Sequence, residues 1–331
     1  MSQRFKYLEN NILEPNLKLV IENQISSIIN ADTKKKFSFF SDVPDLIGDV
    51  DTHEITEKQK KFYNDIKFPN YDDIDDYGSL IDKSKKNIFT DKLDKEIDYN
   101  SKILEVGCGT GQLTNFLARY SREVYGIDLS KGSLILAEKF RRENNIDRSF
   151  FLRMDTFNIL FKENIFDIII SNGVLHHTKD AKLAFKNILK YLKPNGYVII
   201  GLYHKYGRAY TKLIQFLVKY FGDTFKFMDS KNINPNISEE KRYAWYNDQY
   251  KNPHETLHTY TEIIKWFNEN NIDYISSIPF NLNQNILNEN LFKKQIIKKG
   301  FPIYIEELVQ AFKYSQIKEG GFFIMIGKKP S

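Results

Sequence analysis

The hydrophobic pattern divides the chain into three stretches. Up to about residue 100, apolar positions are scattered among polar ones and are interrupted by Pro44, Pro69 and Gly78. This pattern predicts an N-terminal helical extension over residues 1–100 that caps a main domain. Between residues 101 and 202, short apolar runs alternate with stretches whose apolar residues recur at helical spacing. Such alternation is typical of a parallel sheet whose strands are joined by helices.

The middle and last stretches supply the elements of one α/β domain. Strands are predicted at residues 102–106, 124–127, 150–153, 166–171 and 197–202, and helices at 112–119, 132–144 and 181–192, with a turn at 193–196. A helix at about 255–270 and strands near 272–278 and 321–327 would complete the domain. The order of these elements predicts a doubly wound α/β fold with a mostly parallel, seven-stranded sheet over residues 101–331.

Two aromatic-rich insertions, at about residues 203–252 and 279–320, interrupt the last stretch. Insertions of this length within a compact domain usually carry function. We therefore expect the extension and both insertions to form a cap that selects the substrate. In the first insertion, the helical spacing predicts one apolar face, formed by Leu213, Phe216, Leu217, Tyr220 and Phe221. This face could pack against the core, form a lid over the acceptor or contact a membrane surface.

Composition limits the class of protein. The 331 residues are 41% apolar and 15% aromatic, which is enough for a substantial core. The single cysteine excludes an intrachain disulfide, and no apolar run approaches the ~18 residues of a membrane span. With no recognisable signal peptide, the sequence predicts a cytoplasmic protein. Because 48 basic residues are offset by 43 acidic ones, the net charge of +5 does not indicate a nucleic-acid partner.

A glycine-rich turn is the strongest chemical signal. Gly107, Gly109 and Gly111 follow the first strand of the α/β stretch and open a helix. Glycines let the backbone approach a ligand, and free amide groups at a helix start favour a carboxylate or phosphate. A dinucleotide-binding turn would place its third glycine at position 112, where this chain has Gln112. The spacing therefore favours a cofactor other than a nicotinamide dinucleotide, and a nicotinamide oxidoreductase is the weakest alternative.

Polar residues follow the next three strands. Asp128 ends the second strand, at the sheet edge where α/β folds bind ligands, and could accept hydrogen bonds from both ribose hydroxyls. Its alternative role is as the N-cap of the next helix, which Ser130 could supply instead. Asp155 follows the third strand and could accept from an adenine amine or act as an ordinary loop residue. Asn172 follows the fourth strand and begins the run that ends in His176 and His177.

With these motifs in this order, residues 103–202 resemble the core of class I S-adenosylmethionine-dependent methyltransferases. The run from Val174 to His177 is similar to small-molecule methyltransferases of ubiquinone and menaquinone biosynthesis. The resemblance implies a Rossmann-like fold, S-adenosyl-L-methionine as cofactor, and direct in-line methyl transfer to a small-molecule or lipid-like acceptor. It implies a cofactor site that comprises Glu105, Gly107, Gly109, Gly111, Asp128, Asp155 and Asn172, to which we add the neighbouring Cys108, Gln112, Leu129 and Thr156.

Departures from the family pattern leave the acceptor open. Asn172 is followed by Gly-Val-Leu rather than Pro-Pro-Tyr, so the motif of enzymes that methylate amino groups of nucleic-acid bases is absent. The quinone enzymes lack the long extension and insertions. A methyltransferase for RNA or protein, and a binding module that retains the cofactor without turnover, are therefore the alternatives. The acceptor atom and the oligomeric state are not determined by the sequence.

Candidate residues for the acceptor follow the fourth and fifth strands. His177 and His204 are candidate bases because histidine exchanges protons near neutral pH. Tyr203 emerges at the ligand edge, and Arg208 could hold an anionic group or simply be an exposed arginine at a helix start. Tyr71, in the extension, is predicted to contact the acceptor.

A second group of candidates lies in a zinc-protease-like run. His254, Glu255 and His258 match the pattern H-E-x-x-H, which requires both histidines on one helical face. Pro253 places His254 at the start of the predicted helix, and no third ligand is evident. We therefore predict no metal site and expect His254, His258 and nearby Asp248 to shape the substrate pocket.

Overall fold

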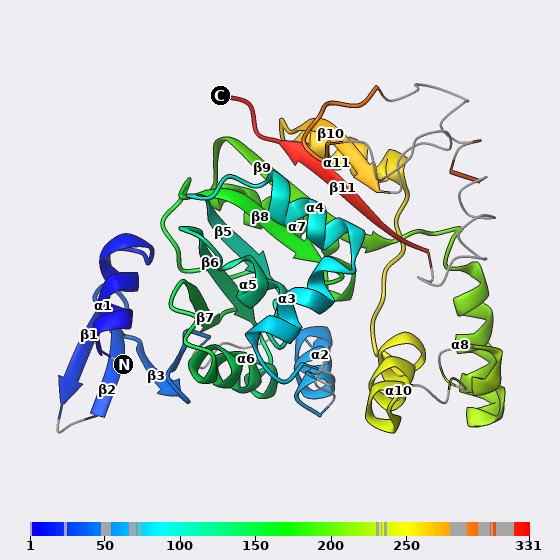
Figure 1. Ribbon diagram of the computed structural model, residues 1–331, viewed down its shortest axis with the longest axis horizontal. Coiled ribbons are helices and arrows are strands. Elements are labelled where there is room, and N and C mark those ends of the chain that lie inside the picture. The colour runs from blue at the N-terminus through cyan, green and yellow to red at the C-terminus, as the bar shows by residue number, and fades with distance from the viewer. Residues whose placement is uncertain are drawn as a thin grey trace.

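The computed structural model describes residues 2–22, 25–47, 54–65, 71, 74–229, 232, 234, 237–278, 290–296, 305, 307, 308 and 321–331. Its centre is a mixed sheet with helices packed on both faces (Figure 1). The strands run in the order β1-β2-β3-β4-β7-β6-β5-β8-β9-β11-β10. The fold is thus α/β and Rossmann-like, but the sheet has eleven strands rather than the predicted seven.

The five central strands are parallel and confirm the predicted ones. They are β5 (Lys102–Val106), β6 (Glu123–Asp128), β7 (Ser149–Arg153), β8 (Phe166–Asn172) and β9 (Leu192–Tyr203). The connecting helices are α5 (Gln112–Leu117), α6 (Lys131–Glu143) and α7 (Ala181–Ile188), with short 3-10 turns at Leu175–His177 and Leu189–Tyr191. The predicted turn at 193–196 is wrong, because β9 begins at Leu192 and includes these residues.

Both faces of this sheet are covered, as the continuous apolar runs of the strands require. Side chains alternate across a strand, so Ile168 and Ile170 pack in one core cluster and Ile169 in the other. All three are nearly or fully buried. On the far side, β11 (Phe322–Lys328) pairs antiparallel with β9, and β10 (Asp273–Ile278) pairs antiparallel with β11. The helix before them, α11, spans Tyr260–Glu269 and begins five residues later than predicted.

The N-terminal extension is not purely helical. It contains four helices, α1 (Ser2–Asn11), α2 (Glu54–Asp65), α3 (Tyr77–Lys85) and α4 (Ile88–Glu96). It also contains four strands, β1 (Leu17–Glu22), β2 (Ile25–Asn30), β3 (Lys36–Phe40) and β4 (Val43–Asp45), which continue the main sheet beyond β7. Strand β3 is partly exposed and β4 is buried but only three residues long, so neither has the long apolar runs of the central strands.

A buried ion pair attaches this strand extension to the core. The Arg153 guanidinium lies 3.0 and 2.9 Å from the two carboxylate oxygens of Asp45, and it also donates to the carbonyl oxygen of Leu129. Both charged side chains are largely shielded from solvent. The pair therefore fixes β4 against β7 at the point where the loop after β6 begins.

The first insertion forms a helical subdomain beside the sheet. It consists of α8 (Ala209–Phe221), a 3-10 segment η3 (Gly222–Met228), α10 (Glu239–Tyr246) and a π-helical turn η4 (Asn247–Lys251). In Figure 1, α8 and α10 lie to the lower right of the sheet. Most of the predicted second insertion, at 279–320, lies outside the described residues. Among the helices that the structure describes, none is long and apolar enough to cross a membrane.

We predict that Asp45→Asn lowers the free energy of unfolding by about 3 kcal/mol, because it leaves the Arg153 charge buried without a carboxylate. Urea denaturation measures the change. The matched control is Asp42→Asn, whose ion pair with Arg142 is exposed and should be worth at most about 1 kcal/mol. Equal losses in the two variants would contradict a structural role for the Asp45 pair.

Candidate cofactor and acceptor site

A cavity of about 600 Å³ opens at the carboxyl edge of the parallel strands. This volume lies within the range of small-molecule sites. Residues that follow four different strands reach it, because parallel strands all end at the same edge of a sheet. Of the predicted cofactor-site residues, the cavity is lined by Glu105, Gly107, Cys108, Gly109, Gln112, Asp128, Leu129, Asp155, Thr156 and Asn172.

Gly111 is the predicted residue that does not line the cavity. Its φ of 75° is left-handed, and a Cβ there would lie 2.5 Å from the Phe151 ring. The glycine therefore lets α5 start in close contact with β7. Gly107 has the same φ, and a Cβ on it would lie 2.4 Å from Val174. At Gly107 a side chain would clash with the loop after β8, at the cavity wall.

The Asp128 carboxylate joins the glycine turn to the second strand of the core. Its two oxygens accept hydrogen bonds from the backbone N–H groups of Gly109 and Ser130, both at 2.8 Å. A carboxylate has about four acceptor positions, so two further donors can be accommodated. The Ser130 hydroxyl oxygen accepts from the Ser133 N–H and caps α6. Asp128 is thus not needed as the cap, which removes the main alternative to a ligand role.

A second carboxyl group, that of Glu105, lies deeper in the same cavity. It is buried and accepts a hydrogen bond from the Thr114 hydroxyl. Burial raises the pKa of Glu105 to about 8, since its charged form would be poorly solvated. The side chain is therefore mostly neutral near pH 7 and can both donate and accept a hydrogen bond.

The N-terminal extension closes one side of the cavity. Its wall contains Thr56, Gln59 and Lys60 from α2, Lys83 and Ser84 from α3, and Phe89 and Thr90 from α4. Tyr71 is not part of this wall. Its hydroxyl donates to the carbonyl of Thr110 at 2.8 Å, and its ring stacks on Phe140. Tyr71 thus supports the glycine turn from behind.

His177, in the 3-10 turn after β8, also lines the cavity. Its Nδ1 is 2.8 Å from the carbonyl oxygen of His254, which can only accept, so the neutral ring carries its proton on Nδ1 and Nε2 is the basic nitrogen. Gln59 donates to the same carbonyl at 2.9 Å, which ties α2 to this loop. Burial lowers the pKa of His177, while nearby Asp248 acts in the opposite direction.

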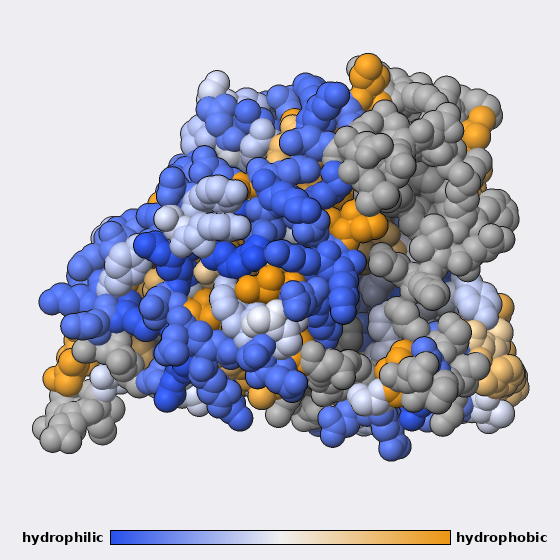
Figure 2. Space-filling view, viewed as in Figure 1, coloured by the Kyte–Doolittle hydropathy of each residue, from blue (hydrophilic) through white to orange (hydrophobic). Residues whose placement is uncertain are grey.

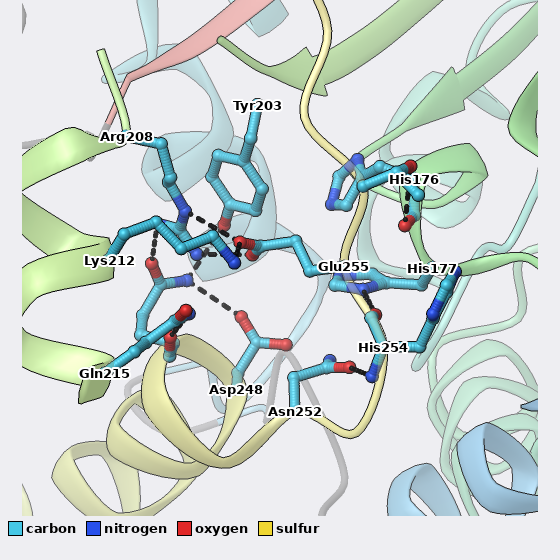
Figure 3. A network of polar contacts seen from close by, with 12 residues as sticks. His176, His177, Tyr203, Arg208, Lys212, Gln215, Asp248, Asn252, His254 and Glu255 are labelled. Atoms are coloured by element: carbon cyan, nitrogen blue, oxygen red, sulfur yellow. Dashed lines mark hydrogen bonds and ion pairs between the residues drawn. The ribbon is translucent and has the colours of Figure 1, made fainter. Parts of the chain in front are cut away.

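A buried polar network forms the wall beyond His177 (Figure 3). Arg208 is fully buried, contrary to the exposed alternative considered for it. Its guanidinium donates to Glu255 at 2.6 Å and lies 3.5 Å from the centroid of the Tyr203 ring. Lys212 adds a second cation 3.0 Å from Glu255. Although burial opposes ionisation, these two cations hold the pKa of Glu255 below its usual value.

Gln249 connects this ion pair to the cavity. Its side-chain oxygen accepts from Arg208 at 2.5 Å, and its amide nitrogen donates to the Tyr203 hydroxyl at 2.8 Å and to Asp248 at 2.9 Å. Tyr203 and Asp248 both line the cavity. Arg208 therefore does not reach the cavity itself but orients two side chains that do.

No motif or pattern in the sequence predicts that Gln59, Gln249 or Phe322 belongs to the site. Gln59 and Gln249 have no motif around them, and Phe322 belongs to a strand whose apolar pattern indicates only core packing. Their positions depend on contacts between segments far apart in the chain. Hydrogen bonds from Gln59 to the 252–254 loop and from Arg208 to Gln249 span about 40 residues or more.

Three of the predicted histidines also do not line the cavity. His204 is buried between the rings of Tyr260 and Phe323, and burial lowers its pKa to about 4. His258 bonds Thr256 and Glu262. His254 contributes its backbone carbonyl, as described above. Of the two candidate bases, His177 alone is among the side chains lining the cavity.

The zinc-protease-like run is not helical. The segment before Thr259 is a loop, and α11 begins only at Tyr260, so the two histidines do not share a helical face. Within the described residues, no group of three or more histidine, cysteine, aspartate or glutamate side chains is arranged to hold a metal ion.

Comparisons with known proteins identify the central part of the chain. Residues 104–200 match the family model described as a methyltransferase domain. Phosphoethanolamine N-methyltransferase 1 of Triticum aestivum is 38% identical over 119 residues, which is 35% of this chain and 23% of that protein. The ubiquinone biosynthesis O-methyltransferase of Rickettsia conorii is 24% identical over 173 residues, 50% of this chain and 59% of that protein.

The family match covers residues 104–200 rather than the whole chain. The chain spans less than two thirds of the length of each of the two relatives. Among solved structures, PKMT2 from Rickettsia typhi aligns over 69% of this chain and 49% of its own, with 15% identity and a TM-score of 0.50. At that identity the structural match supports the Rossmann-like fold alone.

We predict that Glu105→Gln gains stability relative to the unchanged protein as the pH rises from about 5 to 8, by at most about 1.4 kcal/mol per pH unit. Because the folded-state pKa of Glu105 is raised to about 8, the folded protein holds a proton there that the unfolded chain has released. The stabilisation from this bound proton is complete below the pKa that Glu105 has in the unfolded chain. It is lost as the pH rises towards the folded-state pKa. Glutamine has no such proton to lose.

Urea denaturation at a series of pH values tests this. Glu143→Gln is the control, since the Glu143 side chain is 61% exposed. A stability difference between Glu105→Gln and the unchanged protein that stays constant with pH would refute the buried, protonated state of Glu105.

Proposed function

The chain belongs to the class I S-adenosylmethionine-dependent methyltransferases, and we propose that it transfers the cofactor's methyl group to a small-molecule acceptor. The observation that carries the proposal is one cavity lined by two groups of residues with different chemistry. We call the wall formed by the glycine turn, Asp128 and Asp155 the first or cofactor end, and the wall formed by His177, Tyr203 and Asp248 the second or acceptor end. The proposal also includes the cytoplasmic location expected from the cysteine content.

The residues at the first end have the chemistry that an adenosyl sulfonium requires. In our proposal, the remaining acceptor positions of Asp128 take the ribose hydroxyls, and Asp155 accepts from the adenine amine. Gly107 and Gly109 admit the ligand close to the backbone, while Asn172 borders the reacting end. The Asp155 carboxylate is oriented by the Phe157 N–H at 2.9 Å. When bound, the cofactor supplies an electrophilic methyl group on a positively charged sulfur.

The residues at the second end suit an acceptor with an exchangeable proton. We propose that Nε2 of His177 accepts that proton as the acceptor attacks in line, since the His254 carbonyl fixes the required tautomer. The negative charge of Asp248 favours the imidazolium that results. Tyr203 and Phe322 provide aromatic walls that exclude water and align the acceptor.

A small or lipid-like acceptor is the one we propose, rather than RNA or protein. Helices α2 to α4 and Asp248 of the first insertion line the cavity, so both added segments restrict the space around an acceptor. Two relatives are named for ubiquinone biosynthesis and phosphoethanolamine, which supports a small acceptor. The identity of the acceptor atom is left to experiment.

We predict that Asp128→Ala weakens the binding of S-adenosylmethionine about 100-fold, because two charge-assisted hydrogen bonds are lost. Isothermal titration calorimetry measures the affinity. Asp180→Ala serves as the control, since it removes the cap of α7 and should cost about 1 kcal/mol of stability with little effect on affinity, because Asp180 does not line the cavity. Unchanged affinity in Asp128→Ala would sink the ribose assignment.

We predict that His177→Gln lowers methyl transfer by about 100-fold or more, the usual contribution of a general base, while cofactor affinity is retained. The assay follows labelled methyl groups from S-adenosylmethionine into a cell extract, with the small-molecule, protein and RNA fractions counted separately. His204→Gln is the control and should keep most of the activity, since His204 does not line the cavity. Label found mainly in RNA or protein would contradict a small acceptor.

A further inference from the structure

Helix α8 exposes a continuous aromatic and apolar surface. Its members, called here the α8 face, are 44% to 64% exposed and comprise Tyr210, Leu213, Phe216, Tyr220 and Phe221. Phe227, in the following 3-10 segment, is 57% exposed and extends it. Other large apolar side chains exposed among the described residues are mostly scattered, and isolated exposed residues need no explanation. A gathered surface of this kind usually marks an interaction site.

Packing among the residues that the structure describes does not account for the α8 face. The helix contacts the rest of the subdomain through Thr211, Ile214 and Val218, which are buried. At 3.6 residues per turn, Leu213, Phe216 and Tyr220 lie on a different side of the helix. The rings of Phe216 and Tyr220 are 4.7 Å apart and therefore form one surface. The apolar residues of α8 therefore cover a much wider arc of the helix than the residues that contact the subdomain.

The charged residues of the α8 segment itself are of one sign. From His204 to Gly222 the chain has four basic residues and no acidic residue. Two of the basic side chains, Lys205 and Lys219, are exposed, and the Lys219 ammonium lies 5.7 Å from the centroid of the Tyr220 ring. The first acidic residue after the helix, Asp223, pairs with Lys251. Aromatic side chains bordered by lysines are typical of helices that lie in a membrane interface.

Helix α8, through the side opposite the α8 face, packs beside the acceptor end of the cavity. Helix α8 starts one residue after Arg208, which orients Tyr203, and it contacts the η4 turn that contains Asp248. In Figure 1 the helix lies at the right-hand edge of the molecule, and Figure 2 shows apolar colour along that edge. A surface bound there would be close to the site at which the acceptor reacts.

We propose that the α8 face binds peripherally to the surface of an anionic phospholipid bilayer. The aromatic and apolar side chains would insert at the boundary between headgroups and acyl chains, and Lys205 and Lys219 would contact anionic headgroups. The proposal goes beyond the proposed function and does not depend on methyl transfer. Together the two would explain how a lipid-like acceptor reaches the cavity.

The test is co-sedimentation of the full chain with vesicles of phosphatidylcholine alone, or of equal parts phosphatidylcholine and phosphatidylglycerol. We expect binding to the mixed vesicles that weakens as salt is added. The double variant Phe216→Glu/Tyr220→Glu should bind at least about tenfold less, since two inserted aromatic side chains are replaced by anions. Lys205→Glu/Lys219→Glu should lose the preference for the anionic vesicles.

Leu183→Glu is the matched control, because Leu183 on α7 is 49% exposed but has no such neighbours. Its vesicle binding should equal that of the unchanged protein, and calorimetry with S-adenosylhomocysteine should give the same affinity for all variants. The proposal is overturned if the unchanged protein binds neither kind of vesicle. It is equally overturned if Leu183→Glu lowers vesicle binding as much as Phe216→Glu/Tyr220→Glu does. It is also overturned if sedimentation velocity shows that the α8 face joins two copies of the chain. Vesicle binding without methyl transfer would refute the proposed function alone.

Discussion

Parallel pairing of β7, β6, β5 and β8 is the constraint on which the site depends. Each of these strands ends at the same edge, so residues separated by up to 67 positions, from Glu105 to Asn172, line one cavity. The polar groups are on the turns after the strands, where backbone amides are free to bind them. A sheet buried on both faces holds these turns in fixed positions, which is why a small number of side chains suffices to define the cavity.

Two carboxyl groups in this cavity differ because their hydrogen-bond partners differ. Asp128 accepts two backbone N–H groups, which partly offset the cost of burying its charge. Glu105 accepts a hydrogen bond from the Thr114 hydroxyl, and burial is the largest effect on its pKa, which it raises. The first is suited to accept from hydroxyl groups of a ligand, and the second is mostly a neutral donor and acceptor near pH 7.

The first insertion turns a common core into a specific cavity. Its buried ion pair between Arg208 and Glu255 would be costly without further partners, and Gln249, Tyr203 and Lys212 provide them. The same insertion places Asp248 at the cavity and an aromatic helix at the surface. In our two proposals, recognition of the acceptor and contact with a membrane surface therefore both involve the one segment added after β9.

The sequence by itself determined the α/β core, the five parallel strands and most of the cofactor end. It could do so because buried strands need continuous apolar runs, and because the glycine turn and strand-end acids are local features. The position of Asp128 at the cavity could be predicted in this way, because it ends a buried parallel strand.

Only the tertiary structure decided the rest. The strands β1 to β4 were missed because short strands are stabilised by their sheet neighbours rather than by a pattern of their own. Nothing local distinguishes His177 from His204, yet packing directs one into the cavity and buries the other between aromatic rings. Arg208 is buried because Glu255, 47 residues away, neutralises it. Contacts between distant segments do not produce a repeating pattern of apolar residues. The residues of the acceptor end could therefore be brought together only in the folded structure, not from the sequence pattern.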